Sequence, residues 1–267
     1  MKTILKTLFA SESIDTFGVI PFSECRVINR NLLERCCKGW YPHSAILILA
    51  PYYSGEYPKR NLSLYAVARD YHLFFRALYA RMERELSARF PDYHFCGFAD
   101  HSPIGEIGAA AKAGLGIIGD KGQLIHKTYG SYTFVGEILT DFIFDHYDTV
   151  PIETCEHCGA CHAACPTKGG CLSEMTQRKG ELPSEAVTLI RSVRTVWGCD
   201  LCRTSCPHNQ HIATTPIHFF REALTPFLTA DLVNAMPQAE FEERAYSWRG
   251  RKTILRNLSH FENTELN

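Results

Sequence analysis

The spacing of cysteines in the second half of the chain constrains its fold more than any other feature. Eight of the twelve cysteines lie between Cys155 and Cys206. They form the runs Cys155-x2-Cys158-x2-Cys161-x3-Cys165-Pro166 and Cys199-x2-Cys202-x3-Cys206-Pro207. The first run is that of bacterial ferredoxins, where three thiolates bind one [4Fe–4S] cluster and the fourth binds a second cluster. The spacing therefore predicts a ferredoxin-like module with two clusters that pass electrons one at a time.

Zinc is the main alternative for these cysteines. Zinc takes four ligands in a closed tetrahedron, and His157 and His162 could join such a site. A triplet of cysteines followed by Cys-Pro suits a cluster better, and disulfides are disfavoured because no export signal is expected. The remaining cysteines are expected to be buried structural thiols; they are Cys25, Cys36, Cys37 and Cys96.

Composition indicates a globular protein with a sizeable core. The chain has 267 residues, of which 45% are hydrophobic and 21% charged, and its formal net charge is −1. This charge favours neither nucleic-acid nor membrane binding by the molecule as a whole. The N-terminal apolar stretch is broken by Lys6, which argues against a signal peptide, and the apolar run 45–50 is too short to span a bilayer. A cytoplasmic location and no membrane partner are expected.

Apolar patterning predicts a mixed α/β (α+β) fold. The continuous apolar run 43–53 indicates a strand buried on both faces, and 132–139 indicates another. Helical spacing from Tyr65 to Phe90 predicts a long amphipathic helix that stops at Pro91, and a further helix is predicted over 184–196. We expect a catalytic α/β domain at 1–150, the cluster module at 151–212 and a short helical segment at 213–267.

Several ordered segments resemble epoxyqueuosine reductases, the cobalamin-dependent iron–sulfur enzymes of queuosine biosynthesis. They include Ala45-Ile-Leu-Ile-Leu-Ala-Pro-Tyr-Tyr53, Phe98-Ala-Asp-His-Ser-Pro-Ile104, Gly130-Ser-Tyr-Thr-Phe-Val-Gly-Glu-Ile-Leu-Thr-Asp141 and Trp197-Gly-Cys-Asp-Leu-Cys202. The resemblance implies a nitroreductase-like domain that binds cobalamin, followed by the double-cluster domain. It further implies reduction of the epoxide of a modified tRNA base to an alkene. Because low-valent cobalt is hard to reach, a low-potential ferredoxin or flavodoxin is the expected electron donor.

Site residues follow from the same resemblance. Asp100 matches the family's proton donor, a role for which a positioned carboxylic acid is chemically suited. Without the resemblance, a helix N-cap or a satisfied turn aspartate is the commoner role for such a residue. Other positions match corrin-contacting stretches, although each alone reads as an ordinary helix or strand face; they are Arg69, Asp70, His72, Ser131 and Tyr132.

The family pattern also distributes the cluster ligands. It implies that the first cluster is bound by Cys155, Cys158, Cys161 and Cys206. It implies that the second is bound by Cys165, Cys171, Cys199 and Cys202. The segment between Cys165 and Cys171 is shorter than usual, which makes Cys171 the weakest match.

Two departures from the family pattern bear on function. The segment Gly114-Leu-Gly-Ile-Ile-Gly-Asp120 has Ile117 and Asp120 where the family has tryptophan and lysine. The chain also stops soon after Arg256, where full-length members enter a C-terminal helical-repeat extension. A basic cluster near this end could contact phosphate or could be a solvated helix end; it comprises Arg249, Arg251, Lys252 and Arg256.

Three functions therefore remain open. The first is an epoxyqueuosine reductase-like enzyme that acts on modified tRNA or a related substrate. The second is an electron-transfer protein without cobalamin, favoured by the altered segment 114–120. The third is a reductive dehalogenase-like reductase, since that group combines the same two cofactors. The sequence does not indicate the oligomeric state.

Overall fold

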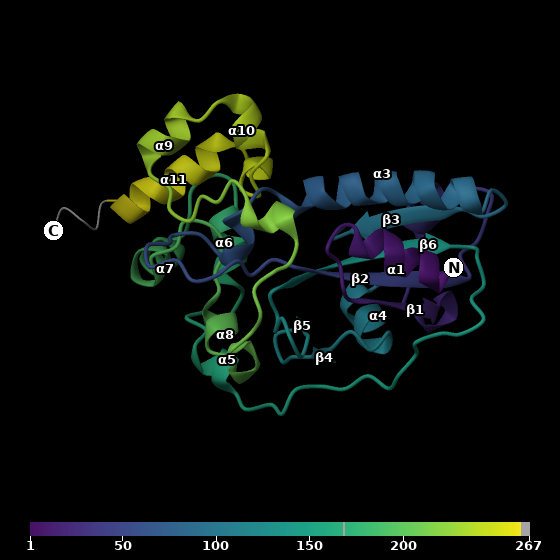
Figure 1. Cartoon of the computed structure of the whole chain (residues 1–267). Helices are drawn as coiled ribbons and strands as arrows, with labels where there is room; N and C mark the ends of the chain where they lie inside the picture. Colours follow the sequence, from purple (N-terminus) through teal and green to yellow (C-terminus); the bar gives the residue numbers. More distant parts are fainter. Residues whose placement is uncertain (168, 263–267) are drawn as a thin grey trace. The chain divides into compact units, whose positions relative to one another are not determined.

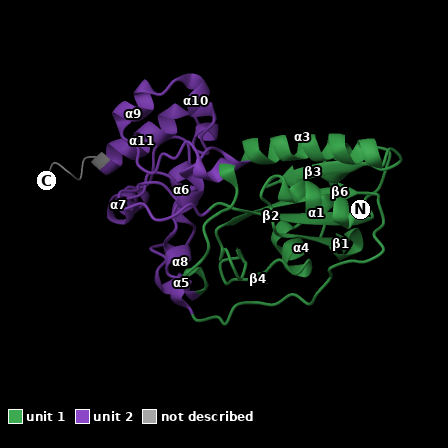
Figure 2. Ribbon diagram, viewed as in Figure 1, with its two compact units in different colours: residues 1–52, 72–158, 208–218 green, residues 53–71, 159–207, 219–267 purple. Residues whose placement is uncertain are grey.

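A computed structural model describes residues 1–167 and 169–262, which divide into two compact units (Figure 2). Unit 1 comprises Met1–Tyr52, His72–Cys158 and His208–His218. Unit 2 comprises Tyr53–Tyr71, Gly159–Pro207 and Phe219–Asn267. Each unit is therefore assembled from segments that are not consecutive in the chain. The division at 150 and 212 that the sequence suggested stays a prediction.

Unit 1 is built on a four-stranded antiparallel sheet in the order β1-β2-β6-β3. Every residue of β2 is buried, as predicted for the apolar run that contains it. In the pairing of β2 with β6, Leu47 lies opposite Glu137 and Ile48 lies opposite Gly136. The elements of this unit are α1 Lys2–Ala10, β1 Phe17–Pro21, η1 Phe22–Glu24, α2 Arg30–Cys36, β2 Ser44–Pro51, α3 Tyr71–Arg89, β3 Phe95–Ala99, α4 Glu106–Lys112, β4 Ile117–Ile118, β5 Leu124–Ile125 and β6 Thr133–Thr140.

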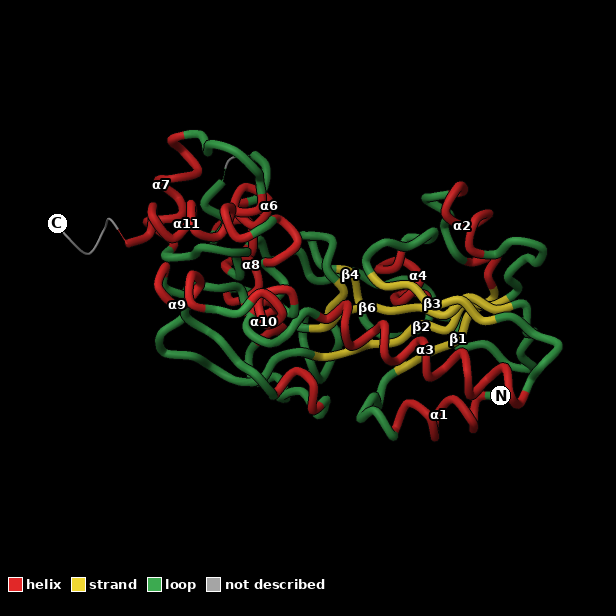
Figure 3. The backbone as a smooth tube through the Cα atoms, turned by 90° about the horizontal axis from the view of Figure 1, so that it is seen from above, coloured by secondary structure: helices red, strands yellow, loops and turns green. Residues whose placement is uncertain are grey.

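Helices cover both faces of this sheet (Figures 1 and 3). One face packs on α2 and α4 through a continuous apolar cluster that includes Leu33, Leu47 and Ala110. The other face lies against α3, and two glycines make that approach close. A Cβ atom on Gly97 would lie 2.3 Å from the Tyr79 ring, and one on Gly136 would lie 2.3 Å from Phe75. These strands therefore tolerate no side chain at either position without movement of the helix.

The long helix predicted over 65–90 is shorter at its start. Leu64–Ala66 forms a 3-10 turn, η2, and α3 begins at Tyr71. The Asp70 N–H donates to the Glu243 carbonyl at 2.7 Å, which takes that backbone group out of helical pairing. The predicted end is confirmed, because the helix finishes at Arg89, just before Pro91.

Unit 2 is mainly helical and carries six of the eight clustered cysteines. Its core includes Trp197 and Tyr246, whose rings meet edge to face at 6.5 Å. Asn257 ties this core together, since its amide donates to the carbonyls of Thr176 and Val196 at 2.7 and 2.8 Å. The elements are α5 Ala160–Ala163, α6 Leu172–Gln177, α7 Ser184–Val193, α8 Leu201–Thr204, α9 Ala230–Ala235, α10 Gln238–Glu242, η5 Ser247–Arg249 and α11 Arg251–Glu262; η3 Pro207–Asn209 and η4 His218–Arg221 lie where the chain changes units.

No helix in the described part of the chain is both long enough and apolar enough to cross a membrane. The helix predicted over 184–196 ends at Val193, because Arg194 turns left-handed with a φ of 56°. A left-handed residue directly after the last helical turn is a common way for a helix to stop.

Candidate active and cofactor site

Asp100 lies just after the end of β3, on the loop that leads into α4. Its side chain is 70% exposed and points its carboxylate to within 3.9 Å of His72 Nε2. Its backbone is left-handed, with a φ of 65°, a conformation that L-residues other than asparagine and aspartate rarely adopt. The backbone N–H of Asp100 donates to Glu106 Oε1 at 2.9 Å. An accessible carboxyl group is thus held on a constrained turn.

The N-cap alternative for Asp100 is wrong. Helix α4 begins at Glu106, its N-cap is Gly105, and no side chain caps it. The carboxylate of Asp100 therefore remains available for chemistry, because it does not satisfy the first amides of a helix.

A pair of carboxyl groups near this loop, one buried and one half-buried, was not anticipated from the sequence. Glu137, in the middle of β6, is fully buried, and its Oε1 accepts a hydrogen bond from the Ser102 hydroxyl. Desolvation raises the pKa of Glu137 well above 4.5 and raises that of Glu106 as well. A charged residue at an apolar position of a central strand was the only signal in the sequence that could have indicated this pair.

The predicted corrin-contacting residues Arg69 and Asp70 are held within unit 2. The Arg69 guanidinium lies 4.5 Å from the centroid of the Phe219 ring and 3.7 Å from a Glu222 oxygen. The Asp70 N–H is bonded to the Glu243 carbonyl. The C-terminal segment of unit 2 therefore sets the conformation of this stretch, and the corrin contact itself stays a prediction.

Ser131 is positioned by a residue that sequence reasoning missed. The Asn209 side chain accepts from the Ser131 N–H at 2.7 Å and donates to the Ser131 hydroxyl at 2.9 Å. Gly130 permits this, because a Cβ atom there would lie 2.1 Å from Asn209 Oδ1 and its φ is 57°. Asn209 follows the last cysteine run, so the sequence separation of 78 residues concealed the contact. The neighbouring Tyr132 is buried and meets Tyr52 edge to face at 5.9 Å.

The four cysteines predicted for the second cluster all belong to unit 2. Burial raises the pKa of the Cys199 thiol to about 11, and the charges of Asp200, Cys202 and Cys171 raise it further. Burial also raises the pKa of Cys202, with contributions from Cys171, Asp200 and Cys165. Such charge effects weaken with distance, so they favour a position of Cys171 near Cys199 and Cys202. The set of four ligands stays a prediction.

The ligands predicted for the first cluster come from both units. Cys155 and Cys158 belong to unit 1, and Cys161 and Cys206 belong to unit 2. This ligand set stays a prediction. Four thiols gathered within unit 2 fit a [4Fe–4S] cluster, because such clusters are held by four close thiolates and ligation removes the thiol protons that burial otherwise retains.

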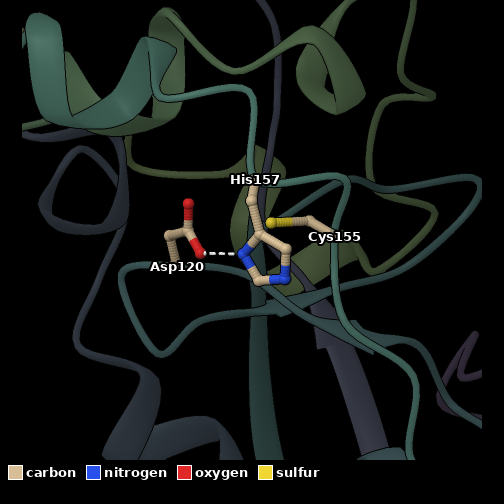
Figure 4. A group of neighbouring side chains, drawn as sticks. All are labelled: Asp120, Cys155 and His157. Carbon is tan, nitrogen blue, oxygen red and sulfur yellow. Dashed lines mark hydrogen bonds and ion pairs between the residues drawn. The ribbon is translucent and has the colours of Figure 1, made fainter.

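The carboxylate of Asp120 is paired with a histidine side chain. This carboxylate accepts from His157 Nδ1, and His157 Nε2 lies 3.2 Å from the Thr154 hydroxyl. Donor atoms of Asp120, Cys155 and His157 lie within 4.8 Å of one another, with the first two side chains directed toward the imidazole (Figure 4). Zinc accepts all three donor types, so the zinc alternative stays open at this end of the cysteine run.

The basic cluster near the C-terminus is largely engaged inside unit 2. Arg251 donates to the carbonyls of Val233 and Met236, which close the C-terminal end of α9. Arg256 donates to the carbonyls of Arg178 and Gly180. Basic side chains commonly satisfy the last carbonyls of a helix in this way. Neither the phosphate-contact nor the solvated-end interpretation describes these two arginines.

A cavity of about 390 Å³ lies at the other end of β3 and contains none of the predicted catalytic or cofactor-binding residues. Its lining includes three residues from separate elements, Cys36, Tyr79 and Cys96. Burial raises the pKa of Cys96 to about 12, and that of Cys37 nearby to about 11. Such thiols are poor nucleophiles. Of the four cysteines predicted to be buried, Cys37 is buried, whereas Cys25, Cys36 and Cys96 are half-buried, so the prediction of full burial is wrong for these three.

Comparison with known proteins supports the resemblance. No family model matches the chain. An epoxyqueuosine reductase of Lactococcus garvieae is 32% identical over 224 residues, which are 76% of this chain and 61% of the relative. One from Listeria monocytogenes is 32% identical over 205 residues, or 70% of this chain and 53% of the relative. The chain thus matches little more than half the length of these relatives.

Solved structures agree with the sequence matches. The epoxyqueuosine reductase of Streptococcus thermophilus superimposes with a TM-score of 0.78 and 22% identity, covering 97% of this chain and 80% of that one. An epoxyqueuosine reductase solved with an epoxyqueuosine-modified tRNA-Tyr stem loop gives a TM-score of 0.78 at 24% identity, with the same coverage. These matches confirm the predicted resemblance and the mixed α/β fold class.

Proposed function

We propose that this chain, a homologue of epoxyqueuosine reductases over most of its length, is an iron–sulfur and cobalamin-dependent reductase of the epoxyqueuosine epoxide in tRNA. The observation that carries the proposal is Asp100, an exposed carboxyl group on a constrained turn at the end of β3. One related enzyme has been seen with its aspartate-bearing catalytic loop swung out of the active site. We assign the corresponding role to Asp100.

The chemistry requires few groups from the protein. Conversion of an epoxide to an alkene and water consumes two electrons and two protons. Cobalamin, when bound, supplies a low-valent metal nucleophile, and the clusters supply electrons singly. Asp100 donates a proton to the departing oxygen, because an alkoxide is a poor leaving group until it is protonated. Its exposure lets solvent return that proton.

The described residues support an iron–sulfur cluster more directly than they support cobalamin. The thiols of Cys165, Cys171, Cys199 and Cys202 would hold one cluster. For cobalamin, the accessible side chain of His72 could bind, whereas Ser131 is buried and its N–H and hydroxyl oxygen are engaged by Asn209. Ser131 therefore acts as a scaffold for its neighbours, and the case for cobalamin depends on the homology.

Anaerobic reconstitution followed by turnover tests this proposal. Protein loaded with iron, sulfide and cobalamin should contain about eight iron atoms per chain and convert epoxyqueuosine-containing tRNA to the alkene under reducing conditions. The Asp100→Asn variant should keep both cofactors and lose at least about 100-fold in kcat, the usual size of a general-acid contribution. A wild-type protein that binds cobalamin but leaves the tRNA unchanged would contradict the substrate assignment.

An electron-transfer protein without cobalamin is the second candidate. It was motivated by the altered segment that ends in Asp120, which pairs with His157. Tight stoichiometric cobalamin binding would exclude it. We further propose a low-potential ferredoxin or flavodoxin as electron donor, tRNA as partner and the cytoplasm as location.

A further inference from the structure

Glu137 is buried in a way that an ionised carboxylate does not tolerate. It lies between Leu47 of β2 and Phe98 of β3 and is fully inaccessible to solvent. The Ser102 hydroxyl satisfies Oε1. Among residues 1–167 and 169–262, Oε2 has no hydrogen-bond donor. An unsatisfied charged oxygen in such a place is costly, so Oε2 is the natural position for a proton.

Glu106 is the carboxyl group that can receive that proton. The two carboxyl groups are close enough for the charge of Glu106 to raise the pKa of Glu137, and a carboxyl group can donate a hydrogen bond only when it is protonated. Two carboxyl groups this close do not both ionise. The other titratable groups that face the pair are Asp100, Tyr79 from α3 and Cys25. Burial raises the pKa of Cys25 to about 12 and that of Tyr79 well above 10.

The pair is tied to both ends of the loop that carries Asp100. At one end, the Asp100 N–H donates to Glu106 Oε1 at 2.9 Å. At the other, the Ile104 N–H donates at 3.0 Å to the Ser102 hydroxyl, which itself donates to Glu137. Aspartate adopts the left-handed region more readily than most residues, so its conformation alone does not fix the loop. These two connections restrain the loop at both ends.

We propose that Glu106 and Glu137 share one proton and act as positioning residues that hold loop 100–104 in the conformation presenting Asp100. Glu106 is the ionised member, which accepts from both the Asp100 N–H and the acid proton of Glu137. This proposal depends on the function proposed above for Asp100, but the shared proton itself does not.

Infrared spectroscopy of the anaerobic holoprotein tests the shared proton without any substrate. At pH 7 the wild type should show the carbonyl stretch of a protonated carboxylic acid, and Glu137→Gln should lack it. Absence of the band from the wild type would overturn the proposal. Because this reading needs no turnover, inactivity toward tRNA would refute the proposed function and leave the carboxyl pair standing.

Kinetics with epoxyqueuosine-containing tRNA tests the positioning role. Glu106→Ala should lower kcat by about 10- to 100-fold, the cost of misplacing a reacting group by about 1 Å, with KM changed less than about threefold. Glu106→Gln should restore most of kcat, because an amide oxygen still accepts from the Asp100 N–H. Glu137→Gln should also keep most of it, since its amide still donates to Glu106. The positioning role would be overturned if the alanine and glutamine variants of Glu106 lost activity equally, or if neither lost any. If the alanine variant does not fold, the two glutamine variants still allow the test.

Discussion

Replacement of Glu137 by glutamine should remove a pH dependence from the stability of unit 1. Burial raises the native pKa of Glu137 well above 4.5, whereas an unfolded glutamate titrates near about 4.3. Above that pH the native protein therefore holds a proton that the unfolded chain releases. The stabilisation is complete below the unfolded pKa and declines as pH rises toward the native pKa, by about 1.4 kcal/mol per pH unit. Over two pH units that lie between the unfolded and the native pKa, the loss is about 2.7 kcal/mol.

Hydrogen exchange of the β6 amides, followed by mass spectrometry and corrected for intrinsic rates, measures the free energy of opening that region. In Glu137→Gln the decline as pH rises from 5 should be smaller than in the wild type by about 1.4 kcal/mol for each pH unit below the native pKa. A packing cost of the amide that does not depend on pH changes the free energy of opening equally at every pH, so it leaves the slope of that free energy with pH unchanged. Glu34→Gln makes the same side-chain replacement at an exposed position of α2 and should run parallel to the wild type. Parallel curves for the wild type and Glu137→Gln would refute the reasoning.

Three further outcomes are expected. Serine at Cys171 should reduce bound iron from about eight to about four atoms per chain, measured by iron analysis after reconstitution; unchanged iron would remove Cys171 from the ligand set. Alanine at Gly130 should destabilise unit 1 by about 2 kcal/mol or more, seen in chemical denaturation, because its Cβ would collide with Asn209 Oδ1 at a left-handed position. Methionine at Arg251 should lower the free energy of unfolding by about 1 to 2 kcal/mol, because it leaves the carbonyls at the end of α9 unsatisfied. Methionine at the exposed Lys252 should change it by less than about 0.5 kcal/mol. Equal effects of the two substitutions would contradict the capping role of Arg251.

Local patterns predicted those features whose physical cause is local. The apolar run that became β2 is fully buried, and the helix that precedes Pro91 ends where proline requires. The start of that helix was misplaced by six residues, since the Asp70 N–H is bonded to a carbonyl more than 170 residues away. The apolar periodicity of a segment carries no information about a hydrogen-bond acceptor that lies far away in the sequence.

The sequence by itself determined the cysteine spacing, and with it the prediction of clusters, because ligands a few residues apart must lie close together in any fold. It also placed an aspartate where the relatives imply a proton donor. Only the tertiary structure showed that this aspartate is not an N-cap and that Glu106 and Glu137 meet beneath it. Their contact depends on a strand and a helix terminus that pack together, and burial in that packing, which no local pattern encodes, sets their protonation.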